Sequence, residues 1–219
     1  MSFVDIMLYI HVLAWVFWLG TDIGVFIGAK FTENAEYSVE TRLTILKLAM
    51  ILDMAPRIAV PVVFTTGVYL AHASYGVQVP PLGIGIGLGL VWLAVVAIGV
   101  LNPPETKLGA RMQKLNLGIN FIALVAMGGL GMASLLGANY FPGWLAAKWL
   151  AYAWIALFAI GIDIAFKPAV MDYMRLMNEG STDEVNASLS KNLKPVYLTV
   201  IAVYLGTMVA AYFGLAKPF

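Results

Sequence analysis

The sequence predicts an all-α protein, a polytopic bundle of about six transmembrane helices that forms one membrane domain over residues 1–219. Composition is the first observation, because 61% of the residues are hydrophobic and only 11% are charged, whereas soluble domains average about 45–50% and about 25%. The second is that the apolar residues form runs long enough to cross a bilayer, which takes about 20 residues. The third is a mean hydropathy of +0.86. Together they exclude a water-soluble enzyme, so any chemistry is expected among the helices.

The first two apolar runs predict two transmembrane helices. The first, residues 3–31, begins with an acidic residue where a signal peptide has cations, so we expect it to be retained. The second, residues 43–73, is too long for one perpendicular crossing at about 1.5 Å per residue, and Pro56 and Pro61 interrupt it. We therefore expect an interfacial piece up to about Asp53, then a kink, then the span.

Four further helices are expected in the rest of the chain. They cover residues 84–101, 115–136, 144–177 and 195–215. The glycine-rich segment GIGIGLG, residues 83–89, predicts helix packing, since no strand precedes it as a phosphate loop would require. The polar stretch 180–192 predicts a mobile loop before the last helix.

The cations predict how the helices are oriented in the membrane. Ten of the thirteen lysines and arginines fall in or beside the connections that follow the first, third and fifth expected helices. Lys148 and Lys217 fall on the other side. Because cytoplasmic loops carry the excess of lysine and arginine, both termini are expected on the non-cytoplasmic side. The expected location is the bacterial inner membrane, and the lipid bilayer is the expected surrounding partner.

Charge and cysteine usage exclude several functions. The formal net charge of +1 provides no basic field of the kind that nucleic acid binding requires, so no nucleic acid partner is expected. The chain has no cysteine. This excludes disulfides, thiolate metal sites, iron–sulfur clusters and covalently attached c-type haem. Oxygen, imidazole and thioether ligands remain.

The two histidines are the predicted metal or cofactor ligands. His11 lies about seven residues, or roughly 10 Å, inside the first helix, and His72 closes the second helix on the same side of the membrane. Imidazole is a common ligand of haem iron and of copper, and a polar side chain at membrane depth suggests a functional site. The alternatives are an interhelical hydrogen bond for His11 and a solvated helix end for His72.

An aromatic stripe continues from His11 along the first helix. His11, Trp15, Trp18 and Asp22 follow one another at steps of four, three and four residues, which places them on one face. Trp15 and Trp18 are therefore predicted to contact a flat macrocycle, the alternative being helix packing. A glycine repeat on the opposite face predicts a close helix contact. It consists of Gly20, Gly24 and Gly28.

The second helix carries a polar stripe that is expected to face the first. It consists of Arg57, Pro61, Thr65, Val68 and His72. If the stripes face each other, Asp22 meets Arg57 or Asp53 near one membrane boundary while His11 approaches His72 near the other. The charged residues then form an ion pair at membrane depth, most simply as a device that sets helix registry.

Two further features suggest ligands. Lys148, at the start of the fifth helix, is predicted to bind a carboxylate such as a haem propionate, the alternative being a lysine that reaches the interface. Met171, Met174 and Met177 are spaced by three residues. Thioethers favour Cu(I), although methionine also commonly fills amphipathic helices.

The first-helix segment LYIHVLAWVFWLG resembles the first helix of the CopD and HemJ families of small membrane proteins. Several other segments resemble HemJ in the same order, over about 150 of the 219 residues. They are TRLTILK, PVVFTTGVYL, GWLAAK, Asn178 with Glu179, Pro195 and the terminal KPF. Residues 82–139 look like an inserted helical hairpin, and a histidine that HemJ proteins carry farther along the fifth helix is absent.

HemJ is a membrane protoporphyrinogen IX oxidase that binds haem b. The resemblance implies that His11 is an axial ligand and that Lys148 takes the part of an important, candidate catalytic lysine. The function expected is therefore a haem b redox protein acting in electron transfer or porphyrinogen-type oxidation, with a porphyrin substrate or a redox partner. A CopD-like copper transporter and a cofactor-free membrane subunit remain alternatives, as do homo- and hetero-oligomeric states.

Overall fold

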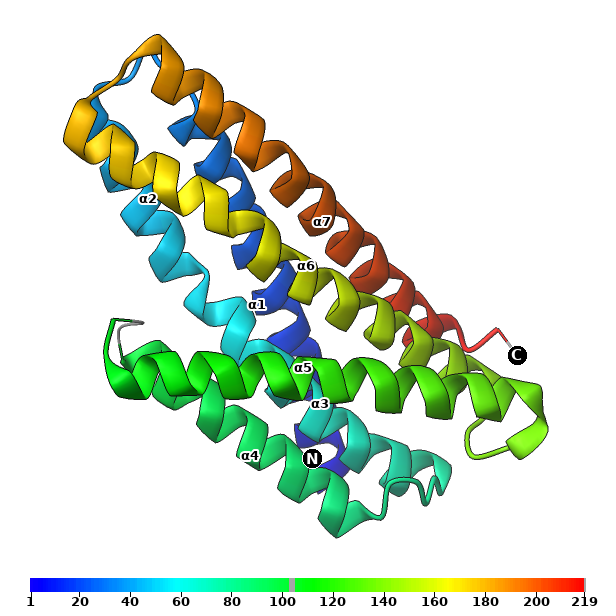
Figure 1. Cartoon of the computed structure of the whole chain (residues 1–219). Coiled ribbons are helices and arrows are strands. Elements are labelled where there is room, and N and C mark those ends of the chain that lie inside the picture. Colours follow the sequence, from blue (N-terminus) through cyan, green and yellow to red (C-terminus); the bar gives the residue numbers. More distant parts are fainter. Residues whose placement is uncertain (103–104, 219) are drawn as a thin grey trace.

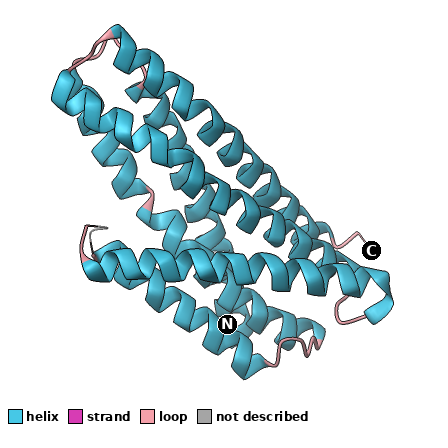
Figure 2. Ribbon diagram, viewed as in Figure 1, coloured by secondary structure: helices cyan, strands magenta, loops and turns pink. Residues whose placement is uncertain are grey.

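The computed structural model describes residues 1–102 and 105–218, and throughout them the regular structure is helical, with no strand (Figure 2). Residues 103 and 104 of the expected connection after the third span, and Phe219 of the KPF segment, lie outside the described residues. The elements are α1 (Phe3–Thr32), α2 (Val39–Leu52), α3 (Met54–Tyr75), α4 (Leu82–Leu101), α5 (Lys107–Ala133), a π-helical turn η1 (Ser134–Ala138), α6 (Gly143–Glu179) and α7 (Asp183–Ala216).

Six helices among the described residues are long and apolar enough to cross a membrane. They are α1, α2 with α3, α4, α5 with η1, α6 and α7. The predicted fold class, an all-α bundle of six candidate membrane spans, is therefore confirmed. The predicted break at Asp53 is also confirmed, since α2 ends at Leu52 and α3 begins at Met54.

Two helices begin earlier than predicted, because side-chain caps start them. α7 begins at Asp183, where the Thr182 hydroxyl accepts a hydrogen bond from the Val185 N–H at 3.3 Å. Acidic residues in its first turn also suit the positive end of the helix dipole. The predicted mobile loop over 180–192 is therefore wrong for most of its length, and Pro195 lies inside the helix. α5 begins at Lys107 rather than near residue 115, capped by Thr106.

The helices pack in a ring. α1 packs on α3, α3 on α4, α4 on α5, α5 on α6 and α6 on α7, and α7 meets α1. The α4–α5 hairpin therefore connects the α1–α3 pair to the α6–α7 pair, with α5 crossing the front of the bundle (Figure 1). Both chain termini lie toward one end of the bundle, hereafter the termini end, and the α6–α7 turn lies at the other (Figure 1).

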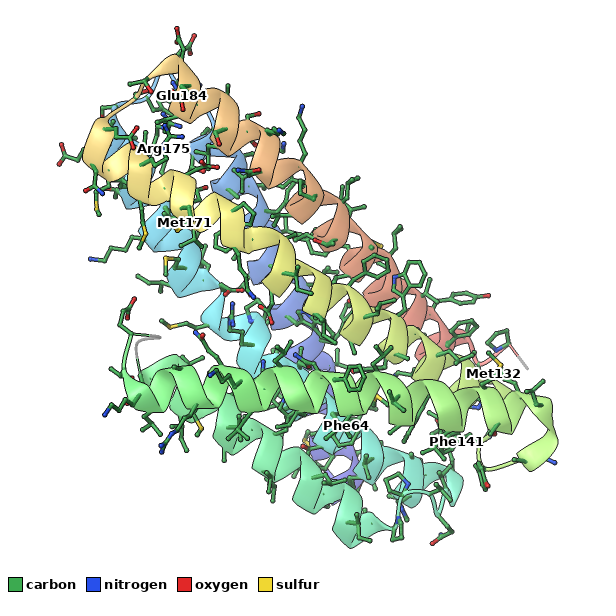
Figure 3. All side chains as sticks on the ribbon, viewed as in Figure 1. Phe64, Met132, Phe141, Met171, Arg175 and Glu184 are labelled. Atoms are coloured by element: carbon green, nitrogen blue, oxygen red, sulfur yellow. The ribbon has the colours of Figure 1, made fainter. Side chains whose placement is uncertain are left out.

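The end that carries the α6–α7 turn is held by a wholly buried arginine. Arg42 of α2 donates from Nε to the Thr32 carbonyl at 2.7 Å, and from Nη1 to Asn186 at 2.8 Å and Ser181 at 3.2 Å. These bonds join the end of α1, α2 and the start of α7. Arg175 and Glu184 form a surface ion pair of 2.9 Å at the same end (Figure 3).

Glycines allow close helix contacts at most of the predicted positions, but the prediction is wrong for Gly20, because nothing lies within 4 Å of its Cβ position. A Cβ at Gly28 would lie 3.2 Å from the Ala49 Cβ, so α1 packs directly on α2. In α4, a Cβ at Gly85 would meet Val68 of α3 at 2.6 Å, and Gly89 lies against Thr65. The GIGIGLG segment is therefore a helix-packing surface, as expected.

The contact between α5 and α6 gives a test of the fold. A Cβ at Gly131 would lie 2.9 Å from the Ala146 carbonyl oxygen, which belongs to the backbone and cannot move aside. Gly131→Ala is therefore expected to lower the free energy of unfolding in detergent by about 1–3 kcal/mol. The matched control is Gly129→Ala in the same helix, because nothing lies within 4 Å of its Cβ position. Equal effects of the two substitutions on the melting temperature would contradict this packing.

Candidate functional site

A large cavity lies toward the termini end, between α1, α3, α6 and α7. Its volume, including the part open to the surroundings, is about 1140 Å³. Its walls are mainly apolar. The polar or aromatic groups in its wall that bear on binding are His11, Trp15, Trp18, Lys148 and Tyr152. The cavity brings together every predicted cofactor residue except His72.

His11 is oriented by a hydrogen bond to α3. Its Nδ1 lies 2.9 Å from the Thr66 Oγ1, and that hydroxyl donates its single proton to the Val62 carbonyl at 2.7 Å. The Thr66 hydroxyl therefore accepts the hydrogen bond from His11, so the Nδ1 of the neutral imidazole carries the proton. The lone pair is left on Nε2, which is the arrangement that metal-binding histidines adopt when a second group fixes the ring.

Gly67 holds the imidazole ring in place from the other side. A Cβ at this position would lie 3.2 Å from the His11 Cε1 and 3.7 Å from its Nδ1. The ring therefore rests directly on the α3 backbone, where a larger residue would push it away from Thr66. Thr66 and Gly67 together fix both the position and the tautomer of His11.

Two tryptophans of the predicted stripe contribute to the cavity wall. Trp18 is 4% exposed and packs with Val63, Ile155 and Val203, closing the cavity on the side away from the termini. Trp15 lines the cavity, and its buried Nε1 has no hydrogen-bond partner. That N–H is enclosed by protein atoms, so the ring contributes an apolar surface to the cavity. These residues fit a flat, largely apolar group.

Lys148 enters the cavity wall from α6. Its Nζ lies 2.7 Å from the Cβ position of Gly214, so the missing side chain of α7 makes room for the ammonium. The amine is close enough to interact electrostatically with His11. Within residues 1–102 and 105–218, Lys148 forms no hydrogen bond or ion pair. A desolvated, unpaired ammonium favours an anionic ligand.

His72 lies in a second, smaller chamber that also reaches His11. This chamber has an empty volume of about 510 Å³ and is lined by both histidines and by Met127 of α5. The His72 Nε2 lies 3.0 Å from the Pro80 carbonyl, which can only accept, so His72 donates there. A metal-binding role for His72 would have to use its Nδ1.

The charged residues of the two predicted stripes lie nearer the C-terminal end of α1, away from the termini end. The Arg57 Nε donates to the Asp53 carboxylate at 2.6 Å, and Asp22 interacts electrostatically with both. Asp22 therefore lies near both residues, as expected, but among the described residues Arg57 forms its ion pair with Asp53 rather than with Asp22. Asp163 of α6 joins this cluster.

The predicted α3 stripe does not face α1 as a whole. Thr65 and Val68 pack instead against Gly89 and Gly85 of α4, because α3 is shared between α1 and α4. The methionine series lies apart from the histidines. Met171, Met174 and Met177 are 50–62% exposed on α6, and Figure 3 places Met171 toward the α6–α7 turn, away from Phe64 of the histidine chamber.

Sequence reasoning missed several residues of these sites, among them Tyr152, Met127 and the three that follow. Thr66, the hydrogen-bond partner of His11, is adjacent to the threonine that the stripe selected. Asp163 carried a usable signal, because it is the acidic residue inside the apolar segment FAIGIDIAF. Lys217 was recognised only by its side of the membrane, yet its Nζ lies 4.9 Å from the ring of Tyr75 at the cavity.

No protein-family model, curated protein or solved structure matches this chain. The functional assignment therefore depends on the chemistry of the cavity: a neutral imidazole with a free Nε2, an unpaired ammonium, and apolar and aromatic walls.

Proposed function

We propose that this protein is a haem b-binding membrane oxidoreductase of the HemJ type, with His11 as the iron ligand. One observation carries the proposal. The His11 Nδ1 is fixed by Thr66 at 2.9 Å in the wall of a large, mainly apolar cavity, which leaves Nε2 free to coordinate. The proposed location is the bacterial inner membrane, with the termini end on the non-cytoplasmic side, as the cation distribution favours.

Each cavity residue has a part in this proposal. Haem, when bound, supplies one-electron chemistry. His11 holds the cofactor, Thr66 fixes the imidazole, and the Trp15 ring contributes a flat apolar wall. Lys148 holds a carboxylate, and Trp18 excludes water from the closed side. Because the His72 Nε2 already bonds to the Pro80 carbonyl, His11 is the histidine that is better prepared to bind iron. A site with one protein ligand would keep space for a porphyrinogen-type substrate.

The absorption spectrum of the purified full-length protein tests the proposal. After incubation with haemin in detergent, we expect a Soret band that shifts on reduction with dithionite, at one haem per chain. A protein that gains no Soret band under these conditions is not a haem protein. Complementation of a bacterial strain that lacks protoporphyrinogen oxidase then tests the proposed oxidation, and failure despite good expression and haem loading would favour simple electron transfer.

The Thr66 hydroxyl gives a second, quantitative test. Thr66→Val keeps the shape of the side chain but removes the acceptor for the His11 Nδ1–H, so haem affinity is expected to fall about 10–100-fold. Thr65→Val is the matched control, because the Thr65 hydroxyl bonds to the Pro61 carbonyl of its own helix at 2.7 Å. Titration with haemin measures both variants. Equal affinities for the Thr66 and Thr65 variants would contradict the role of Thr66.

Copper handling is the second candidate, because the smaller chamber brings His11, His72 and Met127 to one space. Imidazole and thioether ligands suit copper. Bound copper without a Soret band would favour this candidate. A protein that binds neither would favour a membrane subunit whose polar residues set helix registry.

A further inference from the structure

The cavity mouth carries a second lysine in addition to Lys148. Lys217 caps the end of α7, and its Nζ lies 4.9 Å from the ring centre of Tyr75 and 5.7 Å from that of Trp144. Both aromatic residues line the cavity and pack edge to face, 5.0 Å apart. Lys217 therefore lies beside the cavity at its termini end, hereafter the mouth, next to the end of α3 and the start of α6.

The mouth contains two like charges and no acidic partner among the described residues. Lys148 and Lys217 interact unfavourably with each other, and neither forms an ion pair within the described parts of the chain. Asp5, at the same end, is engaged by the Ser2 N–H at 2.7 Å. The described connections 76–81 and 139–142 contain no charged residue. Two unpaired cations at the opening of an apolar cavity favour an occupant with two negative charges.

The cation–π contacts of Lys217 are suited to exchange for such a ligand. At exposed sites a contact of this kind is weak, whereas hydrogen bonds between charged groups are roughly twice as strong as neutral ones. The aromatic rings thus keep the ammonium at the mouth without competing strongly with a carboxylate.

We infer that the mouth recognises the two free carboxylates of a tetrapyrrole, with Lys148 holding one and Lys217 the other. This inference rests on the proposed function and assigns Lys217 as a second positioning residue. The apolar ring lies in the cavity beside His11, and the charged edge faces the termini end. The site therefore selects a tetrapyrrole diacid over the same ring with esterified side chains, and fixes which edge enters first.

Binding of haemin and of haemin dimethyl ester tests the inference. Both ligands are titrated into the full-length protein in phosphatidylcholine nanodiscs, and compared for the wild type, Lys148→Gln, Lys217→Gln and the control Lys191→Gln, an exposed lysine of α7. We expect the wild type to bind the diacid about 100-fold more tightly, since each paired carboxylate contributes about tenfold. Each mouth variant is expected to lose about tenfold of that preference while binding the ester unchanged.

Several outcomes would overturn the inference. One is equal binding of diacid and diester by the wild type. Another is a Lys217 variant that weakens both ligands alike, which would indicate a structural role. A preference that disappears when phosphatidylglycerol replaces part of the lipid would indicate that the lysines bind lipid headgroups instead. If neither ligand binds, the proposed function itself fails, whereas binding without preference refutes only the diacid recognition.

Discussion

His11→Ala is expected to abolish stoichiometric haem binding, with a loss of affinity of at least about 100-fold. Removing a side chain that merely supports a metal ligand costs about 10–100-fold, and here the ligand itself is lost. His11 is the imidazole of the large cavity, held between Thr66 and Gly67. The Soret absorbance per protein after gel filtration measures the effect.

Two controls make this result specific to coordination. His72→Gln is expected to retain haem, because the His72 Nε2 bonds to the Pro80 carbonyl. His11→Gly with added imidazole is expected to regain a Soret band, since a free imidazole can fill the space of the missing ring. An unchanged spectrum of His11→Ala, or loss of haem from His72→Gln instead, would remove His11 as the ligand.

Arg42→Met is expected to lower the free energy of unfolding by about 3–5 kcal/mol. The substitution keeps the chain length but leaves the Thr32 carbonyl without a donor, at about 1–3 kcal/mol. Thr32 and Arg42 are both wholly buried, so water cannot replace this bond. The hydrogen bonds to Ser181 and Asn186 are also lost, at about 0.5–1.5 kcal/mol each, although these two residues keep the hydrogen bonds that they form with each other. Thermal unfolding in detergent, followed by circular dichroism, measures the change.

Arg175→Met is the matched control at the same end of the bundle. Its ion pairs with Glu179 and Glu184 lie at the surface, where such pairs contribute about 0–1 kcal/mol. Because both arginines lie far along the helices from His11, any folded variant is expected to bind haem normally. Equal destabilisation by the two substitutions would contradict the clamp around Arg42.

Much of the architecture could be predicted because the bilayer limits the solutions. Apolar run lengths fixed the number of candidate spans, and Pro56 with Pro61 indicated the break at Asp53. Helix ends were predicted less well, since caps such as Thr182 decide them within a few residues. The polar composition that suggested a loop instead covers the start of α7, where Asn186 bonds to Arg42.

The site residues that share a face of one helix could be predicted, but the contacts between different helices could not. The spacing of His11, Trp15 and Trp18 placed them on one face, and all three line the cavity. The α3 residue that contacts His11 is Thr66 rather than Thr65, so α3 is rotated about its axis by one residue position relative to the prediction. That rotation depends on how α3 divides its surface between α1 and α4, where Gly89 accommodates Thr65. Which face of α3 contacts α1 and which contacts α4 depends on the packing of the whole bundle, so it leaves no local pattern in the sequence.

The most direct test of the central claim uses the scarcity of histidine. The chain has two histidines, so His72→Gln leaves His11 as the single site for ¹⁵N-histidine labelling. Pulsed electron paramagnetic resonance of the ferric haem in this labelled variant measures whether a histidine nitrogen coordinates the iron. We predict strong hyperfine coupling to ¹⁵N, from the Nε2 of His11. Bound haem that shows no ¹⁵N coupling would contradict the account.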